Sequence, residues 1–199
     1  MKIYYATTRH TKVLSLRREI GDITKIVQVP IDFPEPRSSN VKEISKSKII
    51  YAYNQIKRPV VVLDAGFYID SLNGFPRTFV NFALETIGIE GILKLVEGKD
   101  KSCEFRQCLA YLDSYLSKPK YFVSSVPGTL SNKPRGEMQD HLWSELSTIF
   151  VPEGIQKTLA EMSYKEYVDW HKKPSIRPSS KLFSEWLLKY LSKQKTKNL

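Results

Sequence analysis

The stretch Pro59–Phe82, PVVVLDAGFYIDSLNGFPRTFVNF, decides the fold of this 199-residue chain. Its apolar run Val60–Leu63 predicts a buried strand, because a strand that is apolar on both faces belongs inside a sheet covered on both sides. The run ends at Asp64, which places this carboxylate at the carboxyl end of the strand, where α/β sheets carry ligand sites. Asp64 is therefore the first candidate for a functional residue. The alternative is that it is an ordinary turn residue after a strand.

Composition narrows the class of protein. With 41% hydrophobic residues, the chain can bury the core of one domain. No run reaches the roughly 18 to 20 apolar residues of a membrane span, and the amino terminus lacks the apolar core of a secretion signal. We therefore expect a cytoplasmic protein with no membrane partner. Cys103 and Cys108 lie at an odd separation on one predicted strand, so we expect two reduced thiols on opposite faces.

The formal charge of +10, from 31 basic and 21 acidic residues, predicts an anionic partner. This partner is either a polyanion such as nucleic acid or a small phosphorylated ligand. The last residues, 193–199, are basic and polar and carry no hydrophobic pattern. We expect them to form a flexible tail after a single domain at 1–192, which has either one lobe or two.

The amino-terminal segment predicts a strand, a polar loop and a helix. The strand is Lys2–Ala6, and the loop is TTRHTK at 7–12. The backbone N–H groups of such a loop, the helix dipole behind them and the mobile cation of Lys12 together suit a phosphate. The loop lacks the glycines of a P-loop. An equally open interpretation is that Thr7 or Thr8 only caps the helix.

The next loop and helix supply a second carboxylate and a lysine. Glu35 lies between Pro34 and Pro36, which hold the backbone extended and fix the direction of its carboxylate. Asn40 predicts a helix start, and Lys48 falls on the apolar stripe of that helix. Lys48 either extends its ammonium out past apolar neighbours or directs it into an anionic site.

The remaining pattern predicts alternating strands and helices. Trp143 is the large aromatic residue of a segment with little pattern, and we expect it to pack in the core or at a lobe boundary. The expected elements are strands at Lys101–Asp113, Pro119–Val126 and Ile149–Val151, short helices from Phe79 and at Ile89–Val96, helical character over Lys157–Trp170, and an amphipathic last helix through Leu182–Leu191.

Four segments, in this order, resemble motifs of the inosine triphosphate pyrophosphatase family, which hydrolyses non-standard purine nucleoside triphosphates. ATTRHTK at 6–12 is similar to the family's T-G-N-x-x-K loop, and FPEPRSSNVKEISKSK at 33–48 resembles P-E-x-Q…E-I-x-x-K. VVVLDAGFYIDSLNGFPRTFVNF at 60–82 resembles V-x-D-[ST]-G-L…L-x-G-x-P-G, and VPEGIQKTLAEMS at 151–163 resembles P-x-G…T-x-A-E-M. The shared order and spacing argue against chance.

The resemblance implies an α/β fold: a long, mixed, twisted central sheet flanked by helices, with two lobes and a cleft between them, commonly as a homodimer. It also implies Mg²⁺ as cofactor and a nucleoside triphosphate as substrate. Family members use Mg²⁺ and an activated water to cleave between the α- and β-phosphates. The products are a nucleoside monophosphate and pyrophosphate.

The resemblance also assigns roles to residues. Glu35 and Asp64 are implied as magnesium ligands, and Asp64 and Lys48 as the catalytic pair, with Asp64 orienting or deprotonating the water. Hard carboxylate oxygens suit Mg²⁺, and lysines serve as point cations for phosphate oxygens. The residues implied to hold the triphosphate are Thr7, Thr8, Arg9, Lys12 and Lys48. Those implied at the base are Trp143, Ser144, Ser175 and Arg177.

The chain departs from the family pattern most at the base. HLWSE stands where the family has F-G-[YW]-D-P, which aligns Trp143 with the stacking aromatic and Ser144 with the aspartate. Ser175-Ile176-Arg177 is nearest to the family's S-H-R triplet and lacks its histidine, and Leu63 stands where an acidic residue often precedes Asp64. The sequence thus predicts a Mg²⁺-dependent nucleoside triphosphate pyrophosphatase with a diverged base pocket. The alternative is a catalytically weak descendant that binds a nucleotide or nucleic acid.

Overall fold

The computed structural model describes residues 1–34 and 38–197, so Glu35, the expected second metal ligand, lies outside the described residues. The strands are β1 (Lys2–Ala6), β2 (Lys25–Val29), β3 (Val60–Ile69), β4 (Pro76–Arg77), β5 (Ser102–Leu112), β6 (Lys120–Leu130) and β7 (Phe150–Pro152). The α-helices are α1 (His10–Ile20), α2 (Val41–Ile56), α3 (Val80–Thr86), α4 (Gly88–Leu95), α5 (Tyr164–Lys172) and α6 (Ser179–Lys197), with 3₁₀ turns at Gly21–Ile23, Asp70–Leu72, Glu145–Thr148 and Leu159–Glu161.

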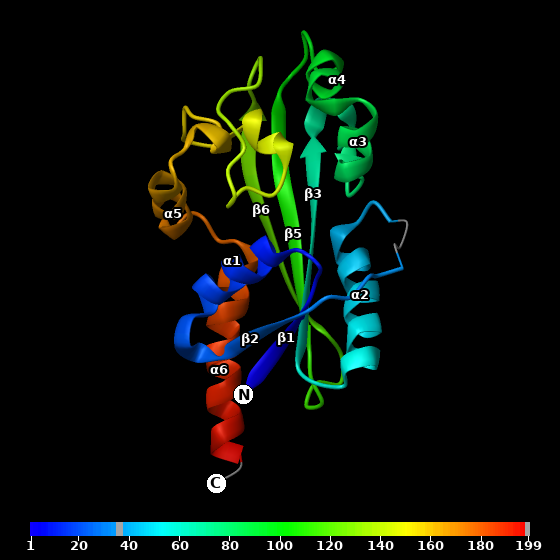
Figure 1. Cartoon of the computed structure of the whole chain (residues 1–199), viewed down its shortest axis with the longest axis vertical. Coiled ribbons are helices and arrows are strands. Elements are labelled where there is room, and N and C mark those ends of the chain that lie inside the picture. The colour runs from blue at the N-terminus through cyan, green and yellow to red at the C-terminus, as the bar shows by residue number, and fades with distance from the viewer. Residues whose placement is uncertain (35–37, 198–199) are drawn as a thin grey trace.

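All seven strands form one sheet in the order β2-β1-β3-β5-β6-β7, and β4 pairs with β3 off this path. The pairs β1–β2 and β1–β3 are parallel, and β3–β5, β5–β6 and β6–β7 are antiparallel. The expected mixed, twisted sheet flanked by helices is therefore confirmed, and its long strands β3, β5 and β6 run along the molecule (Figure 1).

The predicted end of the central strand was wrong. We expected the strand to stop before Asp64, but β3 continues to Ile69 and Asp64 pairs with Cys108 of β5. The reason lies in the neighbouring strands. β1 pairs with β3 only through Tyr4 and Tyr5 and then ends at Ala6, whereas β5 stays paired along the whole of β3. Asp64 thus lies just beyond the last residue of β3 that pairs with β1. On its other side, the backbone hydrogen bonds between β3 and β5 hold it in place.

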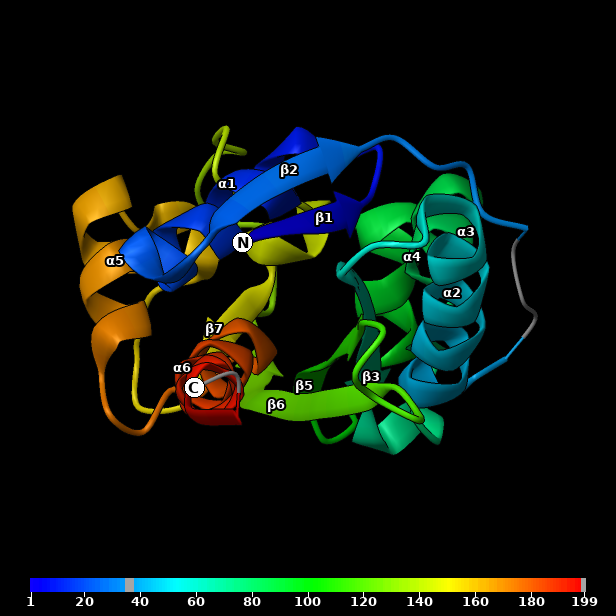
Figure 2. The ribbon, with the colours of Figure 1, turned by 90° about the horizontal axis from the view of Figure 1, so that it is seen from below.

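Helices cover both faces of the sheet in the lower half of the molecule as drawn in Figure 1, which we call the lower lobe. Figure 2 shows α2 on one side of the strands and α6 on the other. Asn40 caps α2, because its side chain accepts a hydrogen bond from the N–H of Lys42 at 2.9 Å. The helix buries Ile49 and Ala52 completely against β3 and β5. On the opposite face, the described apolar stripe of α6 packs against β5, β6 and α1.

Separate hydrophobic cores make the two lobes. In the lower lobe, one core lies under α2 and another under α1 and α6. A third core in the upper lobe surrounds the far half of β3, where Phe67 and Ile69 pack with residues of α4, β7 and α5. β3 and β5 pass through both lobes. Asp64 lies on β3 between the residues of the lower cores and Phe67, at the boundary between the lobes.

A buried aspartate ties the last helix to the sheet. Asp113, only 2% exposed, accepts hydrogen bonds from the hydroxyls of Tyr111 at 2.8 Å and of Tyr190 of α6 at 2.9 Å. It also accepts backbone N–H groups from Tyr115 and Leu116. Buried carboxylates need this many donors because an unpaired charge there is costly. The contact fixes where α6 crosses the β5–β6 hairpin.

Two segments in the carboxyl-terminal part of the chain are helical. α6 continues through Lys197, so residues 193–197 are helical where we expected a flexible tail. These residues include no glycine or proline, and lysine and glutamine are good helix formers. The helical character expected over Lys157–Trp170 is present in two pieces, because a capping box at Ser163 and Glu166 starts α5 afresh after a 3₁₀ turn.

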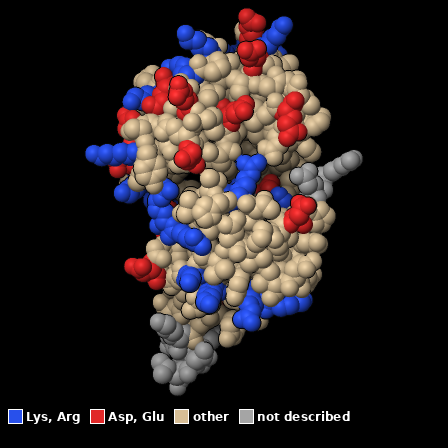
Figure 3. Space-filling view, in the orientation of Figure 1, with Lys and Arg blue, Asp and Glu red and all other residues tan. Residues whose placement is uncertain are grey.

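Three observations on the described residues concern membrane-spanning helices, the thiols and the surface charge. No helix of the described residues is long and apolar enough to cross a membrane. Cys103 and Cys108 are both buried free thiols, as expected. In Figure 3, most acidic side chains of the face shown lie on its upper half, whereas basic side chains lie on both the upper and the lower half. The lobe boundary lies between these halves.

Candidate active site

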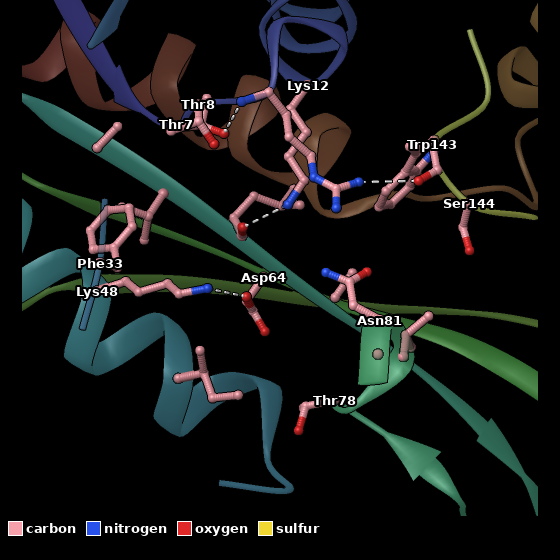
Figure 4. A pocket seen from close by; sticks show the side chains of 18 of the residues that line it. Thr7, Thr8, Lys12, Phe33, Lys48, Asp64, Thr78, Asn81, Trp143 and Ser144 are labelled. Atoms are coloured by element: carbon pink, nitrogen blue, oxygen red, sulfur yellow. Dashed lines mark hydrogen bonds and ion pairs between the residues drawn. The ribbon is translucent and has the colours of Figure 1, made fainter. Parts of the chain in front are cut away.

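A cavity of about 400 Å³ opens at the boundary between the lobes. Its walls come from the loop after β1, the start of α1, the loop before α2, the middle of β3, the segment 78–81 and the loop at 143–144. Figure 4 shows how their side chains converge. We call this space the first cavity. Among the residues that line it are Thr7, Thr8, Arg9, Lys12, Asp32, Phe33, Lys48, Asp64, Thr78, Asn81, Trp143 and Ser144.

Asp64 and Lys48 form an ion pair at the floor of the first cavity. The Nζ of Lys48 lies 2.6 Å from Oδ1 of Asp64, and Asp64 is 9% exposed (Figure 4). Lys48 comes from the stripe of α2 that faces β3, and its ammonium lies 5.8 Å from the ring of Phe33. Of the two interpretations of Lys48, the structure favours the one in which its ammonium enters the site.

Lys12 approaches the same floor from α1. Its Nζ donates a hydrogen bond to the backbone carbonyl of Leu63 at 3.3 Å. Burial lowers the pKa of Lys12 to about 8, Asp64 opposes this change, and the cations of Lys48 and Arg9 add to it. Three cations thus share one cavity with Asp64. An anionic ligand there would relieve the repulsion among them.

The loop 7–9 does not cap α1 through a threonine. The hydroxyl of Thr7 accepts the backbone N–H of Arg9 at 3.1 Å, and Arg9 is the residue before the first turn, without a side-chain cap. Nη1 of Arg9 donates to the carbonyl of Trp143 at 3.2 Å, which joins this loop to the far wall. The uncapped start of α1 therefore leaves N–H groups at the cavity for a ligand.

The donor set of the first cavity fits a magnesium ion. Mg²⁺ is usually held by one or two carboxylates together with substrate phosphates. Asp64 and Asp32 both line the cavity, and the described residues contain no cluster of three or more His, Cys, Asp or Glu side chains. Asp64 and Asp32 are thus the described carboxylates of this cavity that would hold the ion. Sequence reasoning missed Asp32, although it stands in the same proline-rich loop as Glu35.

Thr78 and Asn81 are two further wall residues that the sequence did not single out. Both belong to the turn and helix start that follow β4, inside the stretch from which we began. In the sequence, only their position within that stretch could have indicated that they line the cavity. β3 and β4 pair through Phe67 and Arg77, and this pairing returns the chain to the cavity.

A second cavity, of about 510 Å³, adjoins the first. Lys12, Leu63 and Trp143 line both cavities. The second cavity lies between the sheet and helices α1, α5 and the start of α6, and its walls are more aromatic. Its other lining residues include Tyr5, Arg18, Gln107, His141, Tyr164, Tyr167 and His171.

The residues expected at the base are brought to the site only in part. Trp143 lies at the junction of the two cavities and stacks near Phe105, with ring centroids 6.5 Å apart and an interplanar angle of 28°. Ser144 lines the first cavity, and its hydroxyl accepts the N–H of Leu146. Ser175 and Arg177 line neither cavity.

Arg177 instead forms an exposed ion pair, with Nη2 2.5 Å from Glu185 of α6. Arg177, in the loop that follows α5, is therefore held by Glu185 of α6 and not by a residue of either cavity. The aromatic and imidazole side chains of the second cavity, among them Tyr167 and His171 of α5, occupy the wall beside Trp143. Sequence reasoning missed His171, which lies a few residues before the serine-arginine pair that we aligned.

We predict from the buried position of His171 that the folded protein loses stability in acid. The Nδ1–H of His171 donates to the carbonyl of Tyr167 at 3.0 Å, and burial lowers the pKa of His171 to about 4, a change that this hydrogen bond opposes. Between about pH 6.5 and 4 the unfolded chain binds a proton that the folded chain does not, so the free energy of unfolding falls as the pH falls.

We expect the free energy of unfolding to fall by about 1 to 3 kcal/mol between pH 6.5 and pH 4. Urea unfolding at a series of pH values would measure this fall. His171→Asn keeps a donor near the position of Nδ1 and removes the titrating group. Its unfolding free energy should vary less over the same window than that of the wild type. Equal slopes for the two proteins would contradict the assignment.

The family of the chain follows from comparison with known proteins. Residues 3–173 match the model of the Ham1 family. The chain is 33% identical over 197 residues to a protein of Pyrococcus horikoshii named dITP/XTP pyrophosphatase, covering 96% of this chain and 100% of the relative. It is 35% identical over 145 residues to inosine triphosphate pyrophosphatase 2 of Trypanosoma cruzi, covering 71% and 70%. The chain belongs to the Ham1 family, which confirms the resemblance found in its sequence.

Solved structures support the fold. The Ham1 protein of Staphylococcus aureus matches 94% of this chain, and 98% of its own, with a TM-score of 0.77 and 21% identity. A HAM1 protein of Coxiella burnetii matches 99% of each chain with a TM-score of 0.74 and 22% identity. At these identities the agreement concerns the fold. The mixed sheet with helices on both faces is thus the architecture that these proteins share.

Proposed function

We propose that the chain is a Mg²⁺-dependent nucleoside triphosphate pyrophosphatase. The observation that carries the proposal is the first cavity, where Asp64 meets the ammonium of Lys48 at 2.6 Å and the cations of Lys12 and Arg9 line the same walls. Three cations beside the carboxylates of Asp64 and Asp32 suit a substrate that brings several negative charges and a divalent ion with it. Relatives named dITP/XTP pyrophosphatase make a non-standard purine triphosphate or deoxytriphosphate the proposed substrate.

In the proposed complex the triphosphate occupies the first cavity. Lys12, Lys48 and the N–H groups at the start of α1 hold its oxygens. Lys48 exchanges its contact with Asp64 for a phosphate oxygen, which frees the carboxylate. Mg²⁺ held by Asp64, with Glu35 as a second proposed ligand, would neutralise phosphate charge and lower the pKa of the attacking water.

Asp64 accepts a hydrogen bond from that water and orients its oxygen toward the α-phosphorus. The new bond joins the water oxygen to the α-phosphorus, and the bond from the α-phosphorus to the bridging oxygen breaks. The bridging oxygen leaves with pyrophosphate, and Lys12 and Lys48 stabilise its charge. The water proton passes to Asp64 and then to solvent.

The base is proposed to lie beside Trp143 and to enter the second cavity. Trp143 offers a flat face at the junction of the cavities, which suits stacking of a heteroaromatic ring. The surrounding tyrosines and histidines replace much of the polar set that the family motifs place there. This is the proposed diverged base pocket.

The proposal is tested by pyrophosphate release. Purified protein is incubated with standard NTPs and with ITP, dITP and XTP, with Mg²⁺ or with EDTA. We expect release from at least one keto-purine triphosphate, with Mg²⁺ only. No release from any substrate would contradict the proposal. Salt-sensitive binding of DNA or RNA that survives Asp64→Ala would instead favour the weak nucleic-acid-binding alternative.

We further propose a homodimer. The segment from the turn before β4 to α4 exposes Phe79 (44%), Phe82 (65%) and Leu95 (43%), a concentration of large apolar side chains that typically marks an interface. Light scattering coupled to size exclusion should give a dimer mass for the wild type. Phe82→Ser should shift the mass toward the monomer. A wild-type monomer at every concentration would contradict the dimer.

The proposed location is the cytoplasm. Nucleoside triphosphates are available there, and the two buried thiols, Cys103 and Cys108, suit a reducing compartment. Fractionation of cells that make the native protein should recover it with soluble cytoplasmic markers. Recovery with another compartment would contradict the assignment.

A further inference from the structure

Tyr5 is a buried tyrosine whose hydroxyl has no partner. It lies on β1, is 1% exposed, and lines the second cavity. Its hydroxyl makes no hydrogen bond to any residue in the described part of the chain, and it is not among the fully enclosed atoms there that lack a partner, so its oxygen reaches the space of the second cavity. Other buried tyrosine hydroxyls are paired: that of Tyr111 donates to Asp113, and that of Tyr68 donates to the carbonyl of Ser39 at 3.1 Å. Because buried tyrosines usually find a partner, Tyr5 stands out.

Tyr5 lines the second cavity only, close to the residues that line both cavities. It pairs in register with Val61 of β3, two residues before Leu63, which lines both cavities. Side chains alternate along a strand, so Tyr5 shares its sheet face with Leu63, whereas Asp64 faces the other side. Burial raises the pKa of Tyr5, and the charge of Asp64 raises it further, so the phenol keeps its proton and acts as a donor.

The wall around Tyr5 holds other polar groups that face the same space. Oε1 of Gln107 accepts from Ser179 at 3.2 Å, which leaves its amide N–H groups for the cavity. Nδ1 of His171 donates to a backbone carbonyl, which leaves Nε2 as an acceptor. Nε2 of His141 is buried and has no partner among the described residues. A cavity with aromatic walls and a few unpaired polar groups is typical of a small-molecule site.

We propose that the hydroxyl of Tyr5 is a specificity-determining group, which donates a hydrogen bond to an acceptor atom of the nucleoside bound in the second cavity. The inference rests on the proposed function for the identity of the ligand. A buried hydroxyl that is left unpaired by a ligand lacking the acceptor disfavours that ligand. Tyr5 thereby contributes to the choice of nucleoside, while the first cavity recognises any triphosphate.

The test is Tyr5→Phe, with Tyr111→Phe as the matched control. Both changes remove one buried hydroxyl from the same sheet face, but only that of Tyr111 has a protein partner. We expect Tyr5→Phe to leave the melting temperature of the free protein unchanged or raised, and Tyr111→Phe to lower it by several degrees. An equal drop for Tyr5→Phe would overturn the inference, because it would show a structural partner.

The ligand measurement uses calorimetric binding of a non-hydrolysable ITP analogue and of inorganic triphosphate, which has no nucleoside. Tyr5→Phe should weaken binding of the analogue about 10-fold, as expected for one lost hydrogen bond, and should leave binding of inorganic triphosphate unchanged. Unchanged binding of the analogue, or an equal loss with both ligands, would overturn the inference.

Two further ligands locate the acceptor. If the effect of Tyr5→Phe disappears for an analogue without the 6-oxo group, the acceptor is on the base. If it disappears for the 2′-deoxy analogue, the acceptor is on the ribose. Persistence with both places the acceptor elsewhere on the nucleoside. Because binding needs no turnover, a wild type that binds through Tyr5 but releases no pyrophosphate would contradict the proposed function alone.

Discussion

Asp64→Asn is expected to lower kcat/KM for pyrophosphate release by about 10³-fold while the protein stays folded. The change removes the negative charge that the proposed mechanism uses twice, to hold the metal ion and to accept a hydrogen bond from the attacking water. It also keeps the shape of the side chain, so the pairing of β3 with β5 through Cys108 is preserved. Steady-state kinetics at saturating Mg²⁺ and circular dichroism of both proteins would measure the two effects.

Asp70→Asn is the control for Asp64→Asn. Asp70 lies six residues further along, where β3 has ended, and lines neither cavity. The same chemical change there should leave kcat/KM within about 2-fold of the wild type, since surface substitutions away from a site have small effects. Equal losses in the two variants would show that Asp64 has no special role, and full activity of Asp64→Asn would contradict the mechanism.

Lys12→Ala is expected to lower kcat/KM by about 100-fold near neutral pH. Lys12 supplies a cation at the point where the first cavity meets the second, and in the proposed complex its loss removes a charge-assisted hydrogen bond to the triphosphate. Two neighbouring cations remain, so we expect a smaller effect than that of Asp64→Asn. Lys46→Ala, which removes an exposed lysine of α2 outside both cavities, should change kcat/KM little.

The pH profile tests Lys12 more sharply. Because its pKa in the free enzyme is lowered to about 8, the cation is present below pH 8 and is lost above it. We expect kcat/KM of the wild type to fall above about pH 8, since kcat/KM reports ionisation in the free enzyme. Lys12→Arg keeps its charge over this range and should lose the decline. An alkaline limb that is identical in the wild type and in Lys12→Arg would contradict the assignment.

The local sequence was enough to single out several residues that line the first cavity. The apolar run before Asp64, the polar loop with Lys12 and the lysine on the apolar stripe of α2 each carry a local physical signal. The structure brings these three residues to one cavity, together with Trp143 from a distant loop. The order of the motifs also indicated the family, and with it the mixed sheet.

The same local reasoning failed where contacts with segments distant in the sequence determine the structure. The end of the central strand was wrong because β5 continues to pair with β3 beyond Asp64, and no pattern within β3 reports this. Ser175 and Arg177 were placed at the base by alignment to a short motif, but the loop after α5 holds Arg177 on Glu185. His171 and Asp32 were missed, since an isolated histidine or aspartate has no periodic signal.

The sequence by itself determined the central strand, the charged groups of the first cavity and the family, because apolar runs, helical stripes and ordered motifs are properties of neighbouring residues. Only the tertiary structure decided the second cavity and the unpaired hydroxyl of Tyr5 within it. The cavity is enclosed by α1, α5 and α6, which lie far apart along the chain. Whether a buried hydroxyl has a partner depends on every side chain packed around it, and that is settled only when distant segments meet.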